Sequence, residues 1–204
     1  MRVIVFGATG KTGQHVLRSA LAAGHEVTGF GRSIDRIEIE DPGLELRKGD
    51  VFDAESVEAA LADHDAVIVC LGSTGLRDKT TLSAGTKMVV DAMATAGVDR
   101  LVVMSAAAVG ESWKQIPWSS RLLFRTMLRN ILADHQAQER IVEQSALNWT
   151  IVRPAVLKDD PGTGNYTATN TGPITKINRA DIAAALVDQL ADSANSHGAI
   201  SVTG

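Results

Sequence analysis

Cysteine is nearly absent from this sequence of 204 residues. The single cysteine, Cys70, excludes an internal disulfide bond, because a disulfide needs two thiols. Cys70 ends an apolar run, Ala66-Val67-Ile68-Val69-Cys70, and we therefore expect its side chain to be buried. A chain without disulfides is typical of a reducing compartment, so the sequence predicts a cytoplasmic protein.

Long hydrophobic runs and an excess of charge are also missing. No apolar run approaches the roughly 20 residues that cross a bilayer, and the chain starts on a β-rich run rather than on a signal peptide. The formal net charge is only -4 at pH 7. This balance gives no reason to expect nucleic acid or a membrane surface as a partner.

Motifs of hydrolases and metalloenzymes are absent too. No G-x-S-x-G sequence is present to form a nucleophile elbow. His135 and Glu139 share one face of an expected helix, but two ligands do not make a metal site. We therefore predict no metal and expect the histidines to be solvated. The acidic pair Asp159-Asp160 is typical of a turn. The five histidines are His15, His25, His64, His135 and His197.

The composition that remains is that of a globular protein. Hydrophobic residues make up 45% of the chain and charged residues 22%, which is enough apolar material for a substantial core. The length suits a single domain over residues 1–204.

The strongest motif lies in the first thirty residues. Residues 2–6 are apolar and β-branched, residues 14–23 are rich in helix formers, and residues 26–30 form a second β-rich run. Gly7-Ala8-Thr9-Gly10-Lys11-Thr12-Gly13 lies between the first strand and the helix. This order is typical of dinucleotide sites, in which free N–H groups at the helix start face the pyrophosphate.

The three glycines of this loop have separate roles. Gly7 allows the chain to turn sharply off the strand, Gly10 allows a pyrophosphate to approach the backbone, and Gly13 allows the helix to pack closely on the sheet. The end of the loop, Gly10-Lys11-Thr12, superficially resembles a Walker A motif. That motif requires a glycine five residues before Gly10, where this chain has Val5, so we exclude it.

The end of the second strand bears on the choice of cofactor. An acidic residue there would bind the ribose 2′-OH of NAD, but this chain has Arg32 and, one helical turn later, Arg36. Two guanidinium groups suit a 2′-phosphate, so the sequence favours NADP(H) over NAD(H). Alternatively both arginines are solvated loop residues, and the neighbouring Asp35 supports that alternative.

The rest of the chain alternates strands with helices. This order predicts an α/β fold with one doubly wound, Rossmann-type parallel sheet and helices on both faces. Residues 156–177 are too few for a second domain, and we expect a small cap over the carboxyl edge of the sheet. The further expected strands are 44–48, 66–70, 101–104, 149–153, a short 166–169, and 199–203, and the further helices are 55–62, 80–96, 119–145 and 179–190.

Residues 106–118 form a longer loop at this edge and contain Trp113 and Trp118. Two tryptophans at the ligand edge of a sheet suggest a lid or a substrate wall. The alternative, that they attach the loop to the core, is equally consistent with the sequence.

Several of these motifs together resemble one family. The glycine loop, with Gly49-Asp50-Val51, Leu71-Gly72, Ser105-Ala106 and Trp149-Thr150-Ile151-Val152-Arg153-Pro154, is similar to the atypical short-chain dehydrogenase/reductases of the NmrA-like type. Within that group the sequence most resembles the branch of flavin and biliverdin-IXβ reductases, over nearly the whole chain. The glycine motif is shared by the wider superfamily, whereas the later motifs are more specific to this branch.

The resemblance implies a series of cofactor contacts along the sheet edge. It implies that Ser105 lies beside the nicotinamide and the substrate, as the residue closest to catalysis. One departure is at Ala155, the position after the proline, where the flavin reductases have a histidine. The other implied contacts are Thr9, Gly10, Lys11 and Thr12 with the pyrophosphate, Arg32 and Arg36 with the 2′-phosphate, Asp50 and Val51 with the adenine, Leu71 and Gly72 with the ribose, and Pro154 and Ala155 with the nicotinamide carboxamide.

Two functions remain open at this point. Typical short-chain dehydrogenases use Tyr-x-x-x-Lys to protonate a carbonyl oxygen, but the only tyrosine, Tyr166, is followed four residues later by Asn170. Hydride transfer from NADPH to a flavin, a quinone or a similar flat acceptor is less demanding, because orientation supplies most of the rate. The alternative is a non-catalytic redox sensor that binds NAD(P) and acts through a protein partner.

Overall fold

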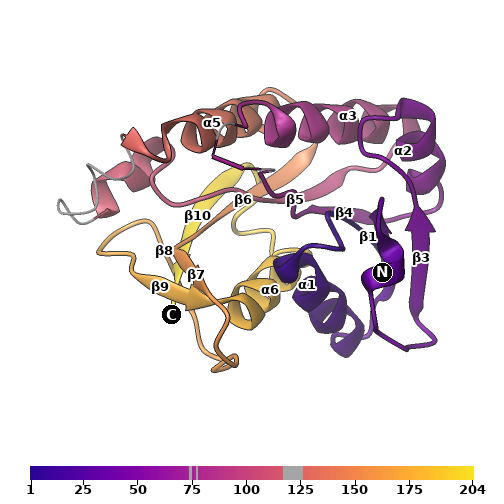
Figure 1. Ribbon diagram of the computed structural model, residues 1–204, viewed down its shortest axis with the longest axis horizontal. Coiled ribbons are helices and arrows are strands. Elements are labelled where there is room, and N and C mark those ends of the chain that lie inside the picture. The colour runs from indigo at the N-terminus through magenta and orange to yellow at the C-terminus, as the bar shows by residue number, and fades with distance from the viewer. Residues whose placement is uncertain (74, 77, 117–125) are drawn as a thin grey trace.

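The molecule is built around one large, mostly parallel sheet (Figure 1). The computed structural model describes residues 1–73, 75–76, 78–116 and 126–204, and within these the sheet has eight strands in the order β3-β2-β1-β4-β5-β6-β10-β8. The strands are β1 (Arg2–Phe6), β2 (Glu26–Gly31), β3 (Leu44–Lys48), β4 (Ala66–Val69), β5 (Arg100–Met104), β6 (Asn148–Pro154), β8 (Thr167–Thr169) and β10 (Gly198–Thr203).

Helices cover both faces of this sheet. α1 (Lys11–Ala22) and α6 (Arg179–Asp188) lie side by side on one face, and α2 (Ala54–Leu61), α3 (Thr81–Ala96) and α5 (Arg129–Glu143) lie on the other (Figure 1). Two short 3₁₀ helices, η1 (Ile34–Arg36) and η2 (Gly110–Gln115), follow β2 and β5. The expected doubly wound Rossmann-type sheet is therefore confirmed.

The segment 156–177 is more than a cap. Its first strand, β7 (Val156–Lys158), pairs in parallel with β9 (Lys176–Asn178) in a separate two-stranded sheet. Between them, β8 runs antiparallel to β10 and extends the main sheet. The free edge of β10 offers backbone donors and acceptors, and a chain returning along that edge satisfies them by pairing.

The core follows from the alternation of side chains along the strands. In β1, Val3 and Val5 face the layer of α1 and α6, whereas Ile4 and Phe6 face the layer of α2, α3 and α5. All four are fully buried. The phenyl ring of Phe6 packs against Phe30 of β2, with ring centroids 5.0 Å apart. Because helices cover both faces of the sheet, its central strands are apolar on both faces.

The helix α1 begins earlier than the sequence predicts. Its first residue is Lys11 rather than Gln14, and Gly10 is its N-cap in an extended conformation. A glycine-rich stretch is normally a poor helix former, but here close packing of the first turn on the loop overrides that preference. Lys11, Thr12 and Gly13 therefore lie in the first helical turn.

The helix α3 is capped from another helix. Thr80, its N-cap residue, makes no side-chain cap. Instead the buried Asp134 carboxylate of α5 accepts hydrogen bonds from the N–H groups of Leu82 (2.9 Å) and Ser83 (3.0 Å). One carboxylate thus satisfies two orphan donors at the α3 start and ties the helices α3 and α5 together.

The expected helix over residues 119–145 is described only in part. α5 covers residues 129–143, while residues 117–125 lie outside the part of the chain that the structure describes. Among the described residues, no helix has the length and apolar character that would let it cross a membrane.

Candidate functional site

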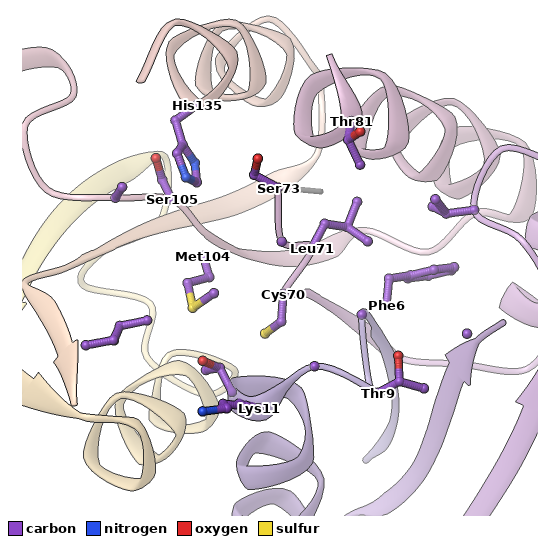
Figure 2. A pocket seen from close by; sticks show the side chains of 18 of the residues that line it. Phe6, Thr9, Lys11, Cys70, Leu71, Ser73, Thr81, Met104, Ser105 and His135 are labelled. Atoms are coloured by element: carbon purple, nitrogen blue, oxygen red, sulfur yellow. The ribbon is translucent and has the colours of Figure 1, made fainter. Parts of the chain in front are cut away.

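A cavity of about 640 Å³ lies over the carboxyl ends of the central strands. It opens between β1 and β4, where the strand order reverses direction, which is the place where open α/β sheets bind ligands. Figure 2 shows side chains from both halves of the sheet reaching into it. The lining residues include Phe6, Gly7, Thr9, Gly10, Lys11, Thr12, Arg32, Asp50, Val51, Cys70, Leu71, Gly72, Met104, Ser105, Ile131, His135, Pro154, Ala155, Leu157 and Arg179.

The glycine loop forms the floor of one end of the cavity. Gly7 has a φ of +85°, and a Cβ atom there would lie 2.5 Å from the carbonyl oxygen of Cys70. A Cβ atom at Gly13 would lie 2.2 Å from the carbonyl oxygen of Gly7. Both positions therefore require glycine, as predicted. Gly13 is absent from the lining because it is packed beneath the loop.

The first turn of α1 carries a network of charged side chains. Lys11 Nζ donates to Asp159 Oδ2 at 2.7 Å, and Arg179 Nε donates to Asp159 Oδ1 at 2.6 Å. Arg179 also donates to Thr12 Oγ1 at 3.0 Å. The hydrogen bond from Lys11, followed by that from Arg179, lowers the pKa of the Asp159 carboxyl. Asp159, which the sequence places in a turn, therefore has a further role, because its carboxylate joins α1 to α6.

Arg179 was not a predicted site residue. It opens α6, more than 160 residues after Thr12, and only the α1–α6 packing brings the two together. No local motif marks it. Its guanidinium adds a second cation to the end of the cavity where the N–H groups of α1 begin.

The two arginines expected at a 2′-phosphate differ in position. Arg32 lines the cavity, and its guanidinium lies 3.9 Å from the carboxylate of Asp50. Arg36 lies in η1, is exposed and is not among the lining residues. Asp35 lies 3.9 Å from Lys48, on β3. Arg32 is therefore the arginine that the structure places at the cavity.

The residues expected around an adenine and its ribose lie together. Asp50, Val51, Leu71 and Gly72 all line the cavity. Phe52 lines it as well and is 48% exposed, although no sequence motif marks this residue. An apolar ring at the rim of a cavity is a suitable surface for stacking.

Ser105 occupies the other end of the cavity, at the carboxyl end of β5. Its backbone N–H donates to the carbonyl of Val152 at 2.8 Å, which fixes the residue against β6. Its Oγ atom is buried and is the one buried side-chain polar atom of the described residues without a hydrogen-bond partner. Pro154 and Ala155, at the end of β6, line the cavity nearby.

His135 contradicts the expectation of solvated histidines. It lies on α5 at 9% exposure and lines the cavity, and Glu139, one turn later, is only 3% exposed. Glu139 forms a buried ion pair with Arg153 of β6 at 2.8 Å. The side of α5 that carries both residues faces the sheet, and an ion pair with a partner from another element cannot be anticipated from helical spacing alone.

The imidazole of His135 is oriented by its neighbours. Its Nδ1 atom lies 3.1 Å from Gln138 Oε1, and Gln138 in turn donates to Thr86 Oγ1 at 2.9 Å. Burial lowers the pKa of His135 below its ordinary value of 6.5. Figure 2 shows the ring reaching from α5 toward the part of the cavity that contains Ser105.

Among the described residues, the aromatic candidates Trp113 and Tyr166 do not line the cavity. Trp113 lies in η2, is partly buried and packs against the core, as the second of the two alternatives predicts. Trp118 lies outside the described residues. Tyr166 donates its hydroxyl to Asp188 at 2.5 Å, and burial together with that hydrogen bond raises its pKa. The single tyrosine of the chain is thus not an acid in this cavity.

The shape and chemistry of the cavity fit a dinucleotide. The glycine loop leaves its backbone accessible at one end, and a Cβ atom at Gly72 would meet nothing within 4 Å. Cationic side chains lie beside the glycine loop at Lys11 and Arg179. The unpartnered hydroxyl of Ser105 lies at the other end, where it can bind a polar group of a ligand.

Comparison with known proteins agrees with this geometry. A family model described as NAD(P)H-binding matches residues 7–193. An uncharacterised chloroplast protein of Arabidopsis thaliana is 31% identical over 176 residues, which cover 80% of this chain and 62% of that protein. The chain thus spans less than two thirds of the length of this relative.

Two solved structures share the fold over the whole chain. A short-chain dehydrogenase/reductase from Veillonella parvula in complex with NADP has a TM-score of 0.83 at 20% identity, covering 100% of this chain and 94% of that one. The anaerobilin reductase ChuY of Escherichia coli O157:H7 has a TM-score of 0.81 at 24% identity, covering 100% of this chain and 97% of that one. At these identities the likeness concerns the fold.

Proposed function

The chain belongs to the NAD(P)H-binding family, and from that premise we propose that it is an NADPH-dependent reductase of a flavin, a quinone or a similar flat acceptor. The observation that carries the proposal is the continuity of one cavity, which runs from the glycine loop to Ser105 along the carboxyl ends of the strands. A bound NADPH would supply the hydride. The protein would supply binding and orientation.

The preference for NADPH is supported by charge near the adenine end of the cavity. Arg32 lies in the lining, where a guanidinium can donate to a 2′-phosphate. The nearest acidic residue of η1, Asp35, lies beside Lys48. The carboxylate beside Arg32 is that of Asp50, at 3.9 Å, so the preference is supported by the guanidinium itself, which suits a 2′-phosphate better than a bare ribose.

The flat acceptor is supported by the lining near Ser105. Met104, Ile131, Ala155 and Leu157 form an apolar wall there. Such a wall can hold an extended ring by burial, while a few polar groups set its orientation. Orientation of two reacting rings lowers the barrier without a dedicated nucleophile.

The experiment that tests this proposal is anaerobic oxidation of NADPH, followed by absorbance, with FMN or 1,4-naphthoquinone as acceptor. We expect turnover with at least one of the two, and slower turnover when NADH replaces NADPH. An enzyme that binds NADPH but oxidises it no faster than buffer, with either acceptor, would defeat the proposal.

A second candidate is favoured by one observation. Tyr166 is held by Asp188 away from the cavity, so no tyrosine is available to protonate a carbonyl substrate. A protein that only binds the cofactor, as a redox sensor acting through a protein partner, needs no such acid. Tight binding of NADPH that leaves the cofactor unchanged, together with a change in partner binding, would support this second function.

A further inference from the structure

The cavity contains two polar side chains, Ser105 and His135, at the end away from the glycine loop (Figure 2). Ser105 is 2% exposed and its hydroxyl has no partner among the described residues. His135 approaches the same region from α5, across the cavity from the glycine loop (Figure 2). Leaving a buried hydroxyl unpaired costs free energy, so such an atom in a cavity is a candidate to bind a ligand atom.

The orientation of the His135 ring leaves one nitrogen for a ligand. Nδ1 is engaged by Gln138, whose side-chain amide nitrogen is itself fixed by Thr86 on α3. Gln138 and Thr86 are both fully buried, so this support is shielded from water. Nε2 is then the ring nitrogen available to a bound molecule, in an orientation that a second layer of hydrogen bonds maintains.

The charged groups around His135 are already paired. On the same helix, Glu139 is bound by Arg153 of β6, and Asp134 accepts from the N–H groups of Leu82 and Ser83 on α3. Both carboxylates favour a proton on the imidazole through space, but burial outweighs them. Among the described residues, neither carboxylate is bonded to His135, so the ring can exchange its proton with a ligand or with solvent.

We propose that His135 is the catalytic proton donor of the reduction, and that its Nε2 and the Ser105 hydroxyl bind the same oxygen atom of the acceptor. This inference rests on the proposed function. It narrows the acceptor to molecules whose oxygen must gain a proton, such as a quinone carbonyl, since a flavin that takes hydride at nitrogen can leave as an anion.

The step balances as follows. A bound NADPH would supply two electrons and one hydrogen to the acceptor as hydride, and would itself be oxidised to NADP⁺. The Nε2–H bond of the imidazolium breaks, and its proton forms an O–H bond on the reduced acceptor. The neutral imidazole then regains a proton from solvent, while the Ser105 hydroxyl donates a hydrogen bond and keeps its own proton.

The first test does not depend on turnover. The ring C–H resonances of the histidines are titrated by NMR in the presence of NADP⁺, with and without 1,4-naphthoquinone. A carbonyl oxygen on Nε2 stabilises the imidazolium, so we expect the titration midpoint of His135 to rise while that of His64 stays unchanged. His64 lies at the opposite end of the sheet, bonded to Thr28.

The second test is kinetic. His135→Gln keeps a side chain of similar length without a titrating ring, and we expect about a 100-fold loss of kcat with the quinone, as for removal of a general acid. NADPH binding should be unchanged, and added imidazole should restore part of the rate in His135→Ala. The matched control, His64→Gln, should behave as the wild type.

A positioning residue offers a third variant that retains the histidine. In Gln138→Glu a carboxylate replaces the amide beside Nδ1, and an ion pair favours the imidazolium. We expect the pH at which kcat falls to move upward by about one unit. If Gln138 has only a structural role, Gln138→Glu should lower kcat without shifting the pH dependence of kcat.

The outcomes separate the inference from the function it rests on. A wild type that turns over the quinone, with a His135→Gln variant equally fast and a His135 resonance indifferent to the quinone, overturns the inference and leaves the reductase. A protein that reduces FMN but neither binds nor reduces the quinone also overturns the inference and leaves the reductase. A protein that reduces neither acceptor overturns both.

Discussion

At the scale of single residues, Arg32 provides the sharpest check of cofactor choice. It lines the cavity, whereas Arg36 is exposed outside the lining. We expect Arg32→Ala to weaken NADPH binding by about 10- to 100-fold, the loss of a charge-assisted hydrogen bond, and NADH binding hardly at all. Arg36→Ala is the matched control and should change both only slightly. Fluorescence titration of each variant with NADPH and with NADH measures the two dissociation constants.

An equal effect of Arg32→Ala on both cofactors would contradict the assignment of Arg32 to the 2′-phosphate. A larger effect of Arg36→Ala than of Arg32→Ala would show that η1 moves onto the cofactor. The sequence alone does not distinguish the two arginines, because both follow β2 within five residues.

Single residues also show what local sequence can and cannot predict. Gly7 and Ser105 follow from their place at strand ends, since parallel strands bring their carboxyl ends to one edge, and Gly13 follows from the spacing of the glycine loop. The burial of His135 cannot be predicted in this way. Its neighbours in the sequence are polar, and no local pattern indicates that this position of the helix faces the sheet. One turn later, Glu139 pairs with Arg153 of β6, and a contact between distant elements likewise leaves no local signal.

At the scale of elements, Asp159 connects β7 to the first turns of α1 and α6. Its carboxylate neutralises Lys11 and Arg179 at the end of the cavity where phosphates would bind. We expect Asp159→Asn to tighten binding of NADPH and NADH alike by several-fold at low salt, because both cations become available to a phosphate. Weaker binding would instead mean that Asp159 positions the two cations.

The control for this variant is the neighbouring residue. Asp160 pairs with Lys158 and does not contact Lys11 or Arg179. Asp160→Asn should therefore leave both affinities unchanged when measured in the same titration. A similar gain in both variants would mark a general effect of net charge, which higher salt would screen.

The cap that α5 provides to α3 predicts a loss of stability. In Asp134→Ala the buried N–H groups of Leu82 and Ser83 lose their acceptor. We expect the free energy of unfolding to fall by about 1–3 kcal/mol, the cost of leaving buried donors unpaired. Asp91→Ala, which removes an exposed pair with Lys87 on α3, should cost about 0.3–0.5 kcal/mol. Urea denaturation measures both, and equal losses would contradict the capping role.

The elements differ in how far the sequence predicts them. β3 was predicted at its observed bounds, because its alternation and its flanking turn residues are local signals. β8 was predicted as a strand, but its antiparallel pairing with β10 depends on residues 201–203, which lie more than 30 positions away. Pairing partners are set by the packed fold rather than by the propensity of either strand.

At the scale of the whole molecule, the histidines make stability depend on pH. Burial is the largest cause of a lowered pKa at His15, His25, His64 and His135. Between the ordinary histidine pKa of 6.5 and these lower values, the unfolded chain binds more protons than the folded one. The free energy of unfolding therefore decreases as the pH falls below about 6.5. Above that pH, the contribution of these histidines to stability is complete.

We expect the urea midpoint to be constant above pH 7 and to decrease from pH 6.5 to pH 5.5. The corresponding free energy of unfolding should fall by at most about 1.4 kcal/mol per pH unit for each histidine. This window isolates the histidines, because the carboxyl groups with lowered pKa values, such as Asp159 and Asp181, titrate in the same direction only at lower pH. His135→Gln should reduce the slope more than His25→Gln, since His135 is the more deeply buried of the two. A midpoint that stays constant as the solution is acidified would mean that folding does not lower the pKa of the histidines, and a midpoint that rises would mean that the folded protein binds these protons more tightly than the unfolded chain does.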